Sequence, residues 1–279
     1  MENPTASPDD HFKKRPVALV TGASSGLGDA FARALAVSGH DLVLVARTGP
    51  ALEKLAAEVE QNHGAQSEVI VADLADVAQL SSVAARIADG APIDTVINNA
   101  GFGHYGAFFQ LPLAGEVGQV QVNVLALVTL SHAALGVMVP RGSGKLLNVS
   151  SIGAFAPAPG GATYSATKAF VLSFTEALHD EVAKDGVHVS ALCPGFTRTE
   201  FQQRAGVKTT GLLSAAWSDA AAVVHAGLSA LDRNHAVCVP GVMNKFVAVS
   251  PRFSPRGMTR RISAGVMQRL EAPQAPTPG

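Results

Sequence analysis

The stretch that decides the fold is VALVTGASSGLG, residues 17–28. A short apolar run leads into a glycine-rich loop, and a helical pattern follows from about residue 27 to 37 and stops at Gly39. This order of strand, loop and helix points backbone amides and a helix N-terminus at a phosphate. It predicts a nucleotide-binding fold, although an ordinary glycine-rich turn would look the same in isolation. The loop residues of interest are Gly22, Ser24, Ser25, Gly26, Leu27 and Gly28, whose glycines follow TGxxxGxG rather than GxGxxG.

A second apolar run, residues 41–46, ends about 20 residues after the loop, where a dinucleotide-binding fold places its ribose-reading residue. An acid there would pair with a 2′-hydroxyl and repel a 2′-phosphate. The chain has Arg47 instead, whose fork of donors suits a 2′-phosphate. A solvated arginine at a strand end is the alternative interpretation. Beside the glycine loop, Arg47 favours NADP(H) over NAD(H).

Apolar runs and helical patterns then alternate along the chain. Further strands are expected at residues 68–72, 93–97, 145–149, 187–193 and 236–239. Helices are expected at 52–60, from a cap at Asp76 to 88, at 119–139, around Tyr164 as far as 184, and from a cap at Ser218 to 231. Together they predict one α/β domain at residues 16–240: a Rossmann-type, doubly wound parallel sheet of about seven strands with helices on both faces.

Residues 150–168, SSIGAFAPAPGGATYSATK, carry the chemistry. Tyr164 and Lys168 are one helical turn apart, so a helix places both side chains on one face. Ser151 lies thirteen positions before Tyr164 at the end of an expected strand. The proline and glycine cluster at 157–161 would turn the chain back so that the serine and the tyrosine meet.

Two further segments suggest a site. Asn98-Asn99-Ala100-Gly101 follows a strand directly, and its small residues would let a ligand approach while asparagine ties neighbouring loops. Asn123 lies in a long apolar helix, where it must be hydrogen-bonded, either as a structural group or as part of a site. Residues 102–113 suit one wall of an apolar pocket, in which His104 and Tyr105 would contact substrate, pack in the interior or lie at the surface.

Composition excludes several classes of function. Acidic and basic residues nearly cancel, 22 against 21, so nothing indicates nucleic acid. The two cysteines, Cys193 and Cys238, are far apart in apolar runs, which favours buried thiols over a disulfide. Residues 1–15 are a polar leader without a signal-peptide core, expected to be disordered, and no uninterrupted apolar run approaches the ~18 residues of a membrane span. The expected location is the cytoplasm, and no metal site is expected.

The C-terminal part differs in character. Residues 241–270 contain six basic residues and no acidic one among apolar side chains. A basic amphipathic extension of this kind would contact an anionic membrane at its periphery, or would pack on the domain or on a second subunit. Residues 271–279 are expected to form a disordered tail.

In their order and spacing these motifs resemble the short-chain dehydrogenase/reductase family from about residue 16 to 240. The matching pieces are TGASSGLG at 21–28, Asp73-Leu74, NNAG at 98–101, Asn123, Ser151, YSATK at 164–168 and PGFTRT at 194–199.

The resemblance implies a role for each matching residue. Asn123, Ser151, Tyr164 and Lys168 correspond to the family's catalytic tetrad, and the family spacing selects Ser151 rather than Ser150. Beyond the glycine loop and Arg47, the resemblance implies further cofactor contacts. Asp73 and the Leu74 backbone would contact the adenine, and Asn99, Ala100 and Gly101 would line the adenosine. Tyr164 and Lys168 would also contact the cofactor, and the nicotinamide amide or the phosphates would be contacted by Pro194, Gly195, Thr197 and Thr199.

The function expected is an NADP(H)-dependent oxidoreductase that interconverts an alcohol and a ketone or aldehyde. Tyr164 is the general acid/base, with Lys168 favouring the tyrosinate, Ser151 orienting the substrate oxygen, and Asn123 bending its helix and holding a water that links Lys168 to solvent. The alternatives are a catalytically silent dinucleotide-binding sensor or scaffold and, on a related fold, a nucleotide-sugar epimerase or dehydratase. A small apolar substrate and a homodimer or homotetramer are expected. The aromatic residues behind the substrate prediction are Phe102, Phe108, Phe109, Phe196, Phe201 and Trp217, the last two bounding an expected mobile wall of the pocket.

Overall fold

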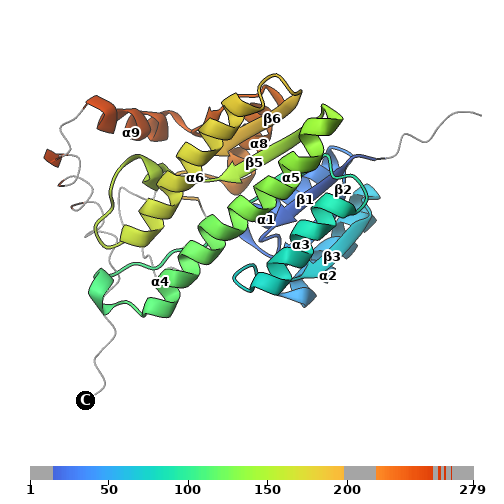
Figure 1. Ribbon diagram of the computed structural model, residues 1–279, viewed down its shortest axis with the longest axis horizontal. Coiled ribbons are helices and arrows are strands. Elements are labelled where there is room, and N and C mark those ends of the chain that lie inside the picture. The colour runs from blue at the N-terminus through green and yellow to red at the C-terminus, as the bar shows by residue number, and fades with distance from the viewer. Residues whose placement is uncertain (1–14, 198–217, 254–256, 259–260, 262–264, 266–279) are drawn as a thin grey trace, which may run out of the picture.

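The computed structural model describes residues 15–197, 218–253, 257–258, 261 and 265 (Figure 1). Its sheet has seven parallel strands in the order β3-β2-β1-β4-β5-β6-β7. The predicted Rossmann-type fold is therefore confirmed. The strands are β1 (Val17–Thr21), β2 (Asp41–Ala46), β3 (Ser67–Val71), β4 (Thr95–Asn98), β5 (Gly144–Val149), β6 (Val187–Leu192) and β7 (Val237–Cys238).

Helices cover both faces of this sheet. Strand side chains alternate between two cores: Ala18 and Val20 of β1 enter one, and Leu19 enters the other. The first core lies under α1 (Gly26–Val37), α2 (Gly49–His63) and α8 (Ala220–Asp232). The second lies under α3 (Val77–Asp89), α5 (Leu127–Arg141) and α6 (Ala162–Glu181), the face toward the viewer in Figure 1. The remaining elements are α4 (Leu113–Val120), α9 (Val242–Phe253), the 3₁₀ turns η1 (Phe108–Gln110) and η3 (Ile152–Phe155), and the π-helical η2 (Gln121–Ala126).

Two expected helix starts are wrong. The cap of α8 is Asp219, whose side chain accepts a hydrogen bond from the Ala222 amide, whereas Ser218 forms a β-bridge with Thr197. The long apolar helix begins at Leu113 rather than at residue 119, and it runs as α4, η2 and α5 without a break.

This continuous helix, Leu113–Arg141, is long and apolar enough by composition to cross a membrane. Core helices of soluble proteins meet the same criterion. Here α5 packs on α3 and on β5, so the fold accounts for its apolar character.

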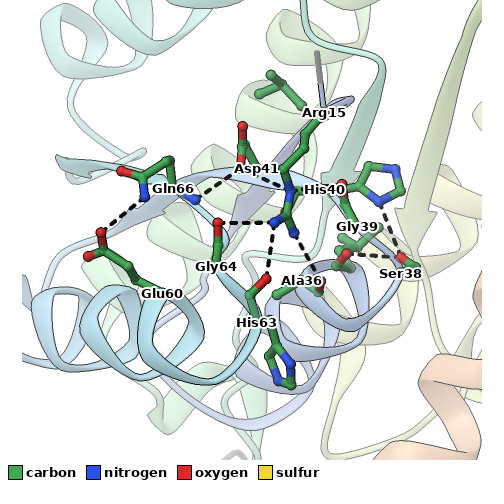
Figure 2. Close-up of polar contacts among 12 residues, drawn as sticks. Arg15, Ala36, Ser38, Gly39, His40, Asp41, Glu60, His63, Gly64 and Gln66 are labelled. Atoms are coloured by element: carbon green, nitrogen blue, oxygen red, sulfur yellow. Dashed lines mark hydrogen bonds and ion pairs between the residues drawn. The ribbon is translucent and has the colours of Figure 1, made fainter. Parts of the chain in front are cut away.

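Arg15 joins the ends of two helices at the amino edge of the sheet (Figure 2). Its guanidinium lies between the C-termini of α1 and α2, where the last carbonyls of a helix have no partner within the helix. It also forms an ion pair of 3.3 Å with Asp41. Arg15 is therefore part of the folded domain. It donates hydrogen bonds to the carbonyls of Gly39, His63 and Gly64 at 3.0–3.1 Å and of Ala36 and His40 at 3.4 Å.

Both cysteines are free thiols. Cys193 packs with Leu172 on one face of the sheet, whereas the Cys238 thiol approaches the Ala226 carbonyl of α8 on the other face. Cys193 directly follows β6 and Cys238 ends the neighbouring β7, but the two side chains lie on opposite faces of the sheet.

Candidate active site

The candidate site lies along the carboxyl edge of the sheet. Strand β1 is flanked by β2 on one side and β4 on the other, so the connections from β1 and β4 leave toward opposite faces. Open α/β sheets bind ligands at this switch point, outside the carboxyl ends of the strands. The predicted site residues follow β1, β2, β3, β4, β5 and β6, and the structure brings those ends to one edge.

The glycine loop has no room for a side chain at Gly22 or Gly28. Gly22 and Gly26 have φ of +66° and +61°, values that favour glycine. A Cβ on Gly28 would overlap the carbonyl oxygen of Gly22. Ser25 is the N-cap of α1, yet its side chain makes no capping hydrogen bond. The first turn of a twelve-residue helix therefore presents its amides to the carboxyl edge, as a phosphate site requires.

Thr21 fastens this loop to the end of β4. Its Oγ1 accepts hydrogen bonds from the Asn99 and Ala100 amides, each at 3.0 Å. Asn99 in turn donates through Nδ2 to the Thr21 carbonyl at 2.9 Å. Asparagine thus ties neighbouring loops, as the sequence suggested. Thr21 was not among the predicted site residues, although it stands directly before the first glycine.

The ends of β2 and β3 present two polar residues near the loop. Arg47 directly follows β2 and is exposed. Asp73 lies just beyond β3, half-buried, with Leu74 buried behind it. The Asp73 amide donates to Gln79 Oε1 at 2.8 Å, and its carboxylate accepts from the Ala75 amide at 3.0 Å. Gln79 thus holds the Asp73 backbone, a role with no local sequence signal.

Ser151 and Tyr164 meet across the turn between β5 and α6. Ser151 is the N-cap of η3, where its Oγ accepts from the Gly153 amide at 3.1 Å, and its side chain is hydrogen-bonded to Tyr164. Ser150 instead donates to the Lys168 carbonyl at 2.7 Å. Burial raises the pKa of Tyr164 to about 12, and the hydrogen bond with Ser151 opposes that rise.

Lys168 is buried beneath the Tyr164 ring. Its side chain donates through Nζ to the Val149 carbonyl at 2.9 Å and lies 5.9 Å from the ring centroid. Burial lowers the pKa of Lys168 to about 8, while the neighbouring Cys193 raises it. The net direction of the Tyr164 pKa is upward, because burial of the phenol outweighs its hydrogen bond with Ser151. The expected effect of Lys168 on the tyrosinate stays a prediction.

Asn123 clamps a loop at the base of the site. It lies in the π-helical segment η2, as its expected bending of the helix suggests. Its Nδ2 donates to the Phe102 carbonyl at 2.9 Å and to Thr167 Oγ1 at 3.1 Å, and its Oδ1 accepts from the Phe102 amide at 3.1 Å. Position 101 has little room for a side chain, because a Cβ on Gly101 would lie 3.0 Å from Asn123 Oδ1 and 3.3 Å from Lys168 Nζ. The water relay through Asn123 stays a prediction.

The loop after β4 also contacts the phenol. A Cβ on Gly103 would lie 2.7 Å from Tyr164 Cδ2, and the Tyr105 ring is 5.7 Å from the Tyr164 ring, tilted by 55°. The loop is held to α4, because the His104 amide donates to Gln119 Oε1 at 3.3 Å. Sequence reasoning missed Gly103 and Gln119, since both act through residues distant in the chain.

His104 and Glu116 form a second pair behind this loop, with 3.6 Å between Nδ1 and Oε1. Glu116 also accepts from Gln119 Nε2 at 2.7 Å. Among the residues described, no three His, Cys, Asp or Glu side chains gather as a metal site would require.

The end of β6 closes the site on its far side. The Pro194 carbonyl accepts from the Ile152 amide at 2.9 Å, and Thr197 Oγ1 donates to the Gly195 carbonyl at 3.2 Å. Asn244 of α9 packs on Gly195, where a Cβ would lie 2.5 Å from Asn244 Nδ2. Three predicted residues lie outside the part of the chain that the structure describes: Thr199, and the pocket-wall residues Phe201 and Trp217.

Proteins of known structure share this fold. A solved short-chain dehydrogenase from Sphingobium yanoikuyae, in complex with NADPH, is 36% identical with a TM-score of 0.78, covering 94% of this chain and 98% of that one. The bulky-bulky ketone specific alcohol dehydrogenase from Comamonas testosteroni is 32% identical with a TM-score of 0.74, covering 94% and 97%. The ketoacyl reductase HetN from Nostoc sp. is 34% identical over 201 residues, 68% of this chain and 70% of HetN. The family model described as short chain dehydrogenase matches residues 16–209. The chain therefore belongs to the short-chain dehydrogenase/reductase family and is an oxidoreductase that acts on CH–OH groups.

Proposed function

We propose that the protein interconverts an alcohol and a ketone or aldehyde with NADP(H), using Tyr164 as general acid and base. The observation that carries this proposal is the hydrogen bond between Ser151 and Tyr164 above the buried Lys168, at the edge that also holds the glycine cradle. Two hydroxyls and one ammonium gathered at a ligand-binding edge suit proton transfer to a carbonyl oxygen.

The residues present fit a dinucleotide with a 2′-phosphate. The Cβ-free cradle at Gly22 and Gly28 and the uncapped start of α1 suit the pyrophosphate. Arg47 suits the 2′-phosphate because it is exposed at the end of β2, next to β1 and its loop. The NADPH complex of the Sphingobium relative supports this assignment. When bound, NADP(H) supplies or accepts the hydride.

The chain's own groups supply the proton and its position. With a pKa of about 12, Tyr164 keeps its proton at neutral pH and can donate it to a carbonyl oxygen during reduction. Ser151 donates a second hydrogen bond to that oxygen and so aligns it with the phenol. Lys168, with a pKa of about 8, is largely protonated at neutral pH and stabilises the developing tyrosinate. Asn123 fixes the Phe102 backbone and thereby the loop that contacts the tyrosine ring.

The proposed substrate is a bulky, apolar carbonyl compound such as an acyl, steroid-like or lipid-derived ketone. Aromatic side chains support this class: Tyr105 lies against Tyr164, and Phe108 and Phe109, 57% and 84% exposed, follow in the same loop. The specificity of the Comamonas relative for bulky ketones and the ketoacyl reductase activity named for HetN point the same way.

A homodimer or homotetramer in the cytoplasm is part of the proposal. The outward side of α4 and η2 supports self-association, because its apolar side chains are exposed and Phe170 of α6 is exposed as well. Sedimentation velocity on the full chain tests it, and a monomer at all concentrations would contradict it. The exposed residues of α4 and η2 are Leu113 (72%), Val117 (46%), Val120 (39%) and Leu125 (54%).

The central test uses the only two tyrosines in the chain. A panel of ketones with NADPH, followed at the nicotinamide absorbance, first identifies a substrate. Tyr164→Phe should then lower kcat by about 100-fold or more, because general acid catalysis is lost. Tyr105→Phe, which removes the neighbouring phenol, is the matched control and should change kcat only slightly. Retained activity in Tyr164→Phe would refute the acid–base assignment.

A separate binding test addresses Arg47. Arg47→Ala should weaken NADPH binding by about 10- to 150-fold while leaving NADH binding unchanged, because one charged hydrogen-bonded pair is worth about 1.5–3 kcal/mol. Equal affinities of the wild-type protein for NADPH and NADH would contradict the 2′-phosphate role.

A further inference from the structure

Helix α9 turns its apolar side chains away from the protein. Asn244 and Ala248 face the domain and are 9% and 4% exposed. Val242, Phe246 and Val249 are spaced by four and three residues, so they share the opposite face, and they are 86%, 72% and 49% exposed. A surface helix of a globular domain ordinarily shows the reverse arrangement, with its apolar stripe toward the core.

Basic charge accompanies this face. Lys245 lies within α9 and is exposed. Residues 241–270 carry six basic residues and no acidic one, whereas the whole chain has 21 basic and 22 acidic residues. The rest of the chain is therefore net acidic, and the sequence that contains α9 is net basic.

The helix also lies beside the candidate active site. It packs on η3, the turn that Ser151 caps, and Asn244 covers Gly195 at the end of β6. Figure 1 shows α9 on the side of the molecule where α4 and the start of α6 lie. A surface seated on α9 would therefore adjoin the edge at which substrate enters.

We propose that α9 is an in-plane docking helix for an anionic lipid bilayer. Its outward face, Val242, Phe246 and Val249, enters the boundary between headgroups and acyl chains, and Lys245 contacts the lipid phosphates. Docked in this way, the protein presents its catalytic edge to the membrane. The consequence that its ketone is lipid-soluble and leaves the bilayer directly rests on the function proposed above.

Charge favours a bilayer over the other occupants of this face. A second copy seated on α9 by a two-fold axis would bring Lys245 against its own counterpart. An acidic protein would satisfy the charges but would have to cover an apolar helix face as well. An anionic bilayer satisfies both, because it offers negative headgroups and an apolar layer within one helix diameter.

Co-sedimentation of the full chain with vesicles tests the proposal without any substrate. The wild-type protein should bind vesicles of equal parts phosphatidylcholine and phosphatidylglycerol, and binding should fall with salt and on pure phosphatidylcholine. Phe246→Ser should lower the partition coefficient about tenfold, and Val242→Ser should lower it several-fold. Lys245→Gln should lower it about fivefold, on the anionic vesicles only.

The matched control is Val37→Ser. Val37 is 68% exposed at the end of α1, on the opposite edge of the sheet, and its variant should bind as the wild type does. Lys245→Gln leaves the apolar face intact, so it tests the proposal even if Phe246→Ser folds poorly. Circular dichroism and NADPH binding report whether each variant is folded.

Three outcomes would overturn the proposal. One is the absence of binding to anionic vesicles by the wild-type protein. Another is equal binding by the wild type and all α9 variants. The third is a change in oligomeric state of Phe246→Ser in sedimentation velocity without any loss of lipid binding, which would assign the face to a second copy.

A kinetic comparison separates docking from catalysis. With an apolar ketone dissolved in anionic vesicles, Phe246→Ser should lose about tenfold in rate, and with a water-soluble ketone it should match the wild type. Equal losses on both substrates would show that α9 acts through the Gly195 loop and not through lipid. Inactivity of the wild type toward every ketone would refute the proposed function while leaving the vesicle result standing.

Discussion

Replacing Lys168 with methionine should abolish activity and yet stabilise the protein at neutral pH. Lys168 is only 5% exposed, and burial lowers its pKa from 10.5 to about 8. At about 1.4 kcal/mol per pKa unit, the charged amine costs the folded state about 3 kcal/mol at pH 7. Methionine keeps most of the stem but leaves the Val149 carbonyl without its donor, a loss of about 1–2 kcal/mol. The expected net gain in the free energy of unfolding is about 1–2 kcal/mol.

The sign of the pH dependence is the sharper part of this prediction. Between pH 8 and 10.5 the unfolded chain holds the Lys168 proton and the folded chain does not, so the stability of the wild type rises with pH. Lys168→Met has no amine at this position, so its stability does not rise with pH in this way. Its advantage should therefore shrink across that window and reverse by about pH 10.5. The raised pKa of Tyr164 cancels in the comparison, because both proteins keep the phenol.

Urea unfolding of both proteins at pH 7, 8, 9 and 10 measures this difference. Lys184→Met, which removes an exposed lysine in the turn after α6, is the matched control and should show no such trend. A difference between Lys168→Met and the wild type that stays constant from pH 8 to 10 would refute the reasoning, since it would mean that Lys168 is not a buried cation.

Three other predictions follow from the same geometry. Gly103→Ala should lower kcat about tenfold or more with little change in NADPH affinity, because its Cβ would press on the Tyr164 ring. The control is Gly136→Ala in α5, where a Cβ would have no atom within 4 Å, and it should leave the steady-state kinetics unchanged. The rate of ketone reduction with NADPH should fall above about pH 8 as Lys168 loses its proton, and a flat profile to pH 10 would contradict that role. Arg15→Met should lower the free energy of unfolding by about 2 kcal/mol in urea while leaving kcat unchanged, because Arg15 caps two helices at the edge away from the site; a loss of kcat at unchanged stability would count against this.

The parallel sheet and the ligand-binding edge were predictable because their signals are local. Apolar runs of four to six residues separated by helical patterns give parallel strands with crossover helices. The spacing of Ser151, Tyr164 and Lys168 is likewise local, since one helix and one turn bring the three together.

The start of the long helix was missed for a tertiary reason. Residues 113–119, LAGEVGQ, contain two glycines, which lower helix propensity and suggest a loop. In the folded chain a Cβ on Gly115 would overlap the His104 ring, and one on Gly118 would lie 3.4 Å from the Phe102 ring. These glycines are therefore needed for packing against a distant loop.

The cap of α8 was missed because Ser218 and Asp219 are both good N-cap residues. Pairing of Ser218 with Thr197, twenty-one residues earlier, leaves Asp219 as the cap.

By itself the sequence determined which residues face the ligand edge, because strand ends, glycine loops and helical spacing are set over a few residues. Only the tertiary structure decided how those residues behave. Gly103 touches Tyr164, Asn123 holds Phe102 and Thr167, and Asn244 covers Gly195 across separations that no local pattern records. The tertiary structure also decided the pKa values of Tyr164 and Lys168. The helical spacing predicted that Lys168 lies beside Tyr164, but their pKa values depend on burial. Burial raises the pKa of the phenol and lowers that of the amine, since the solvation of a charge depends on everything packed around it.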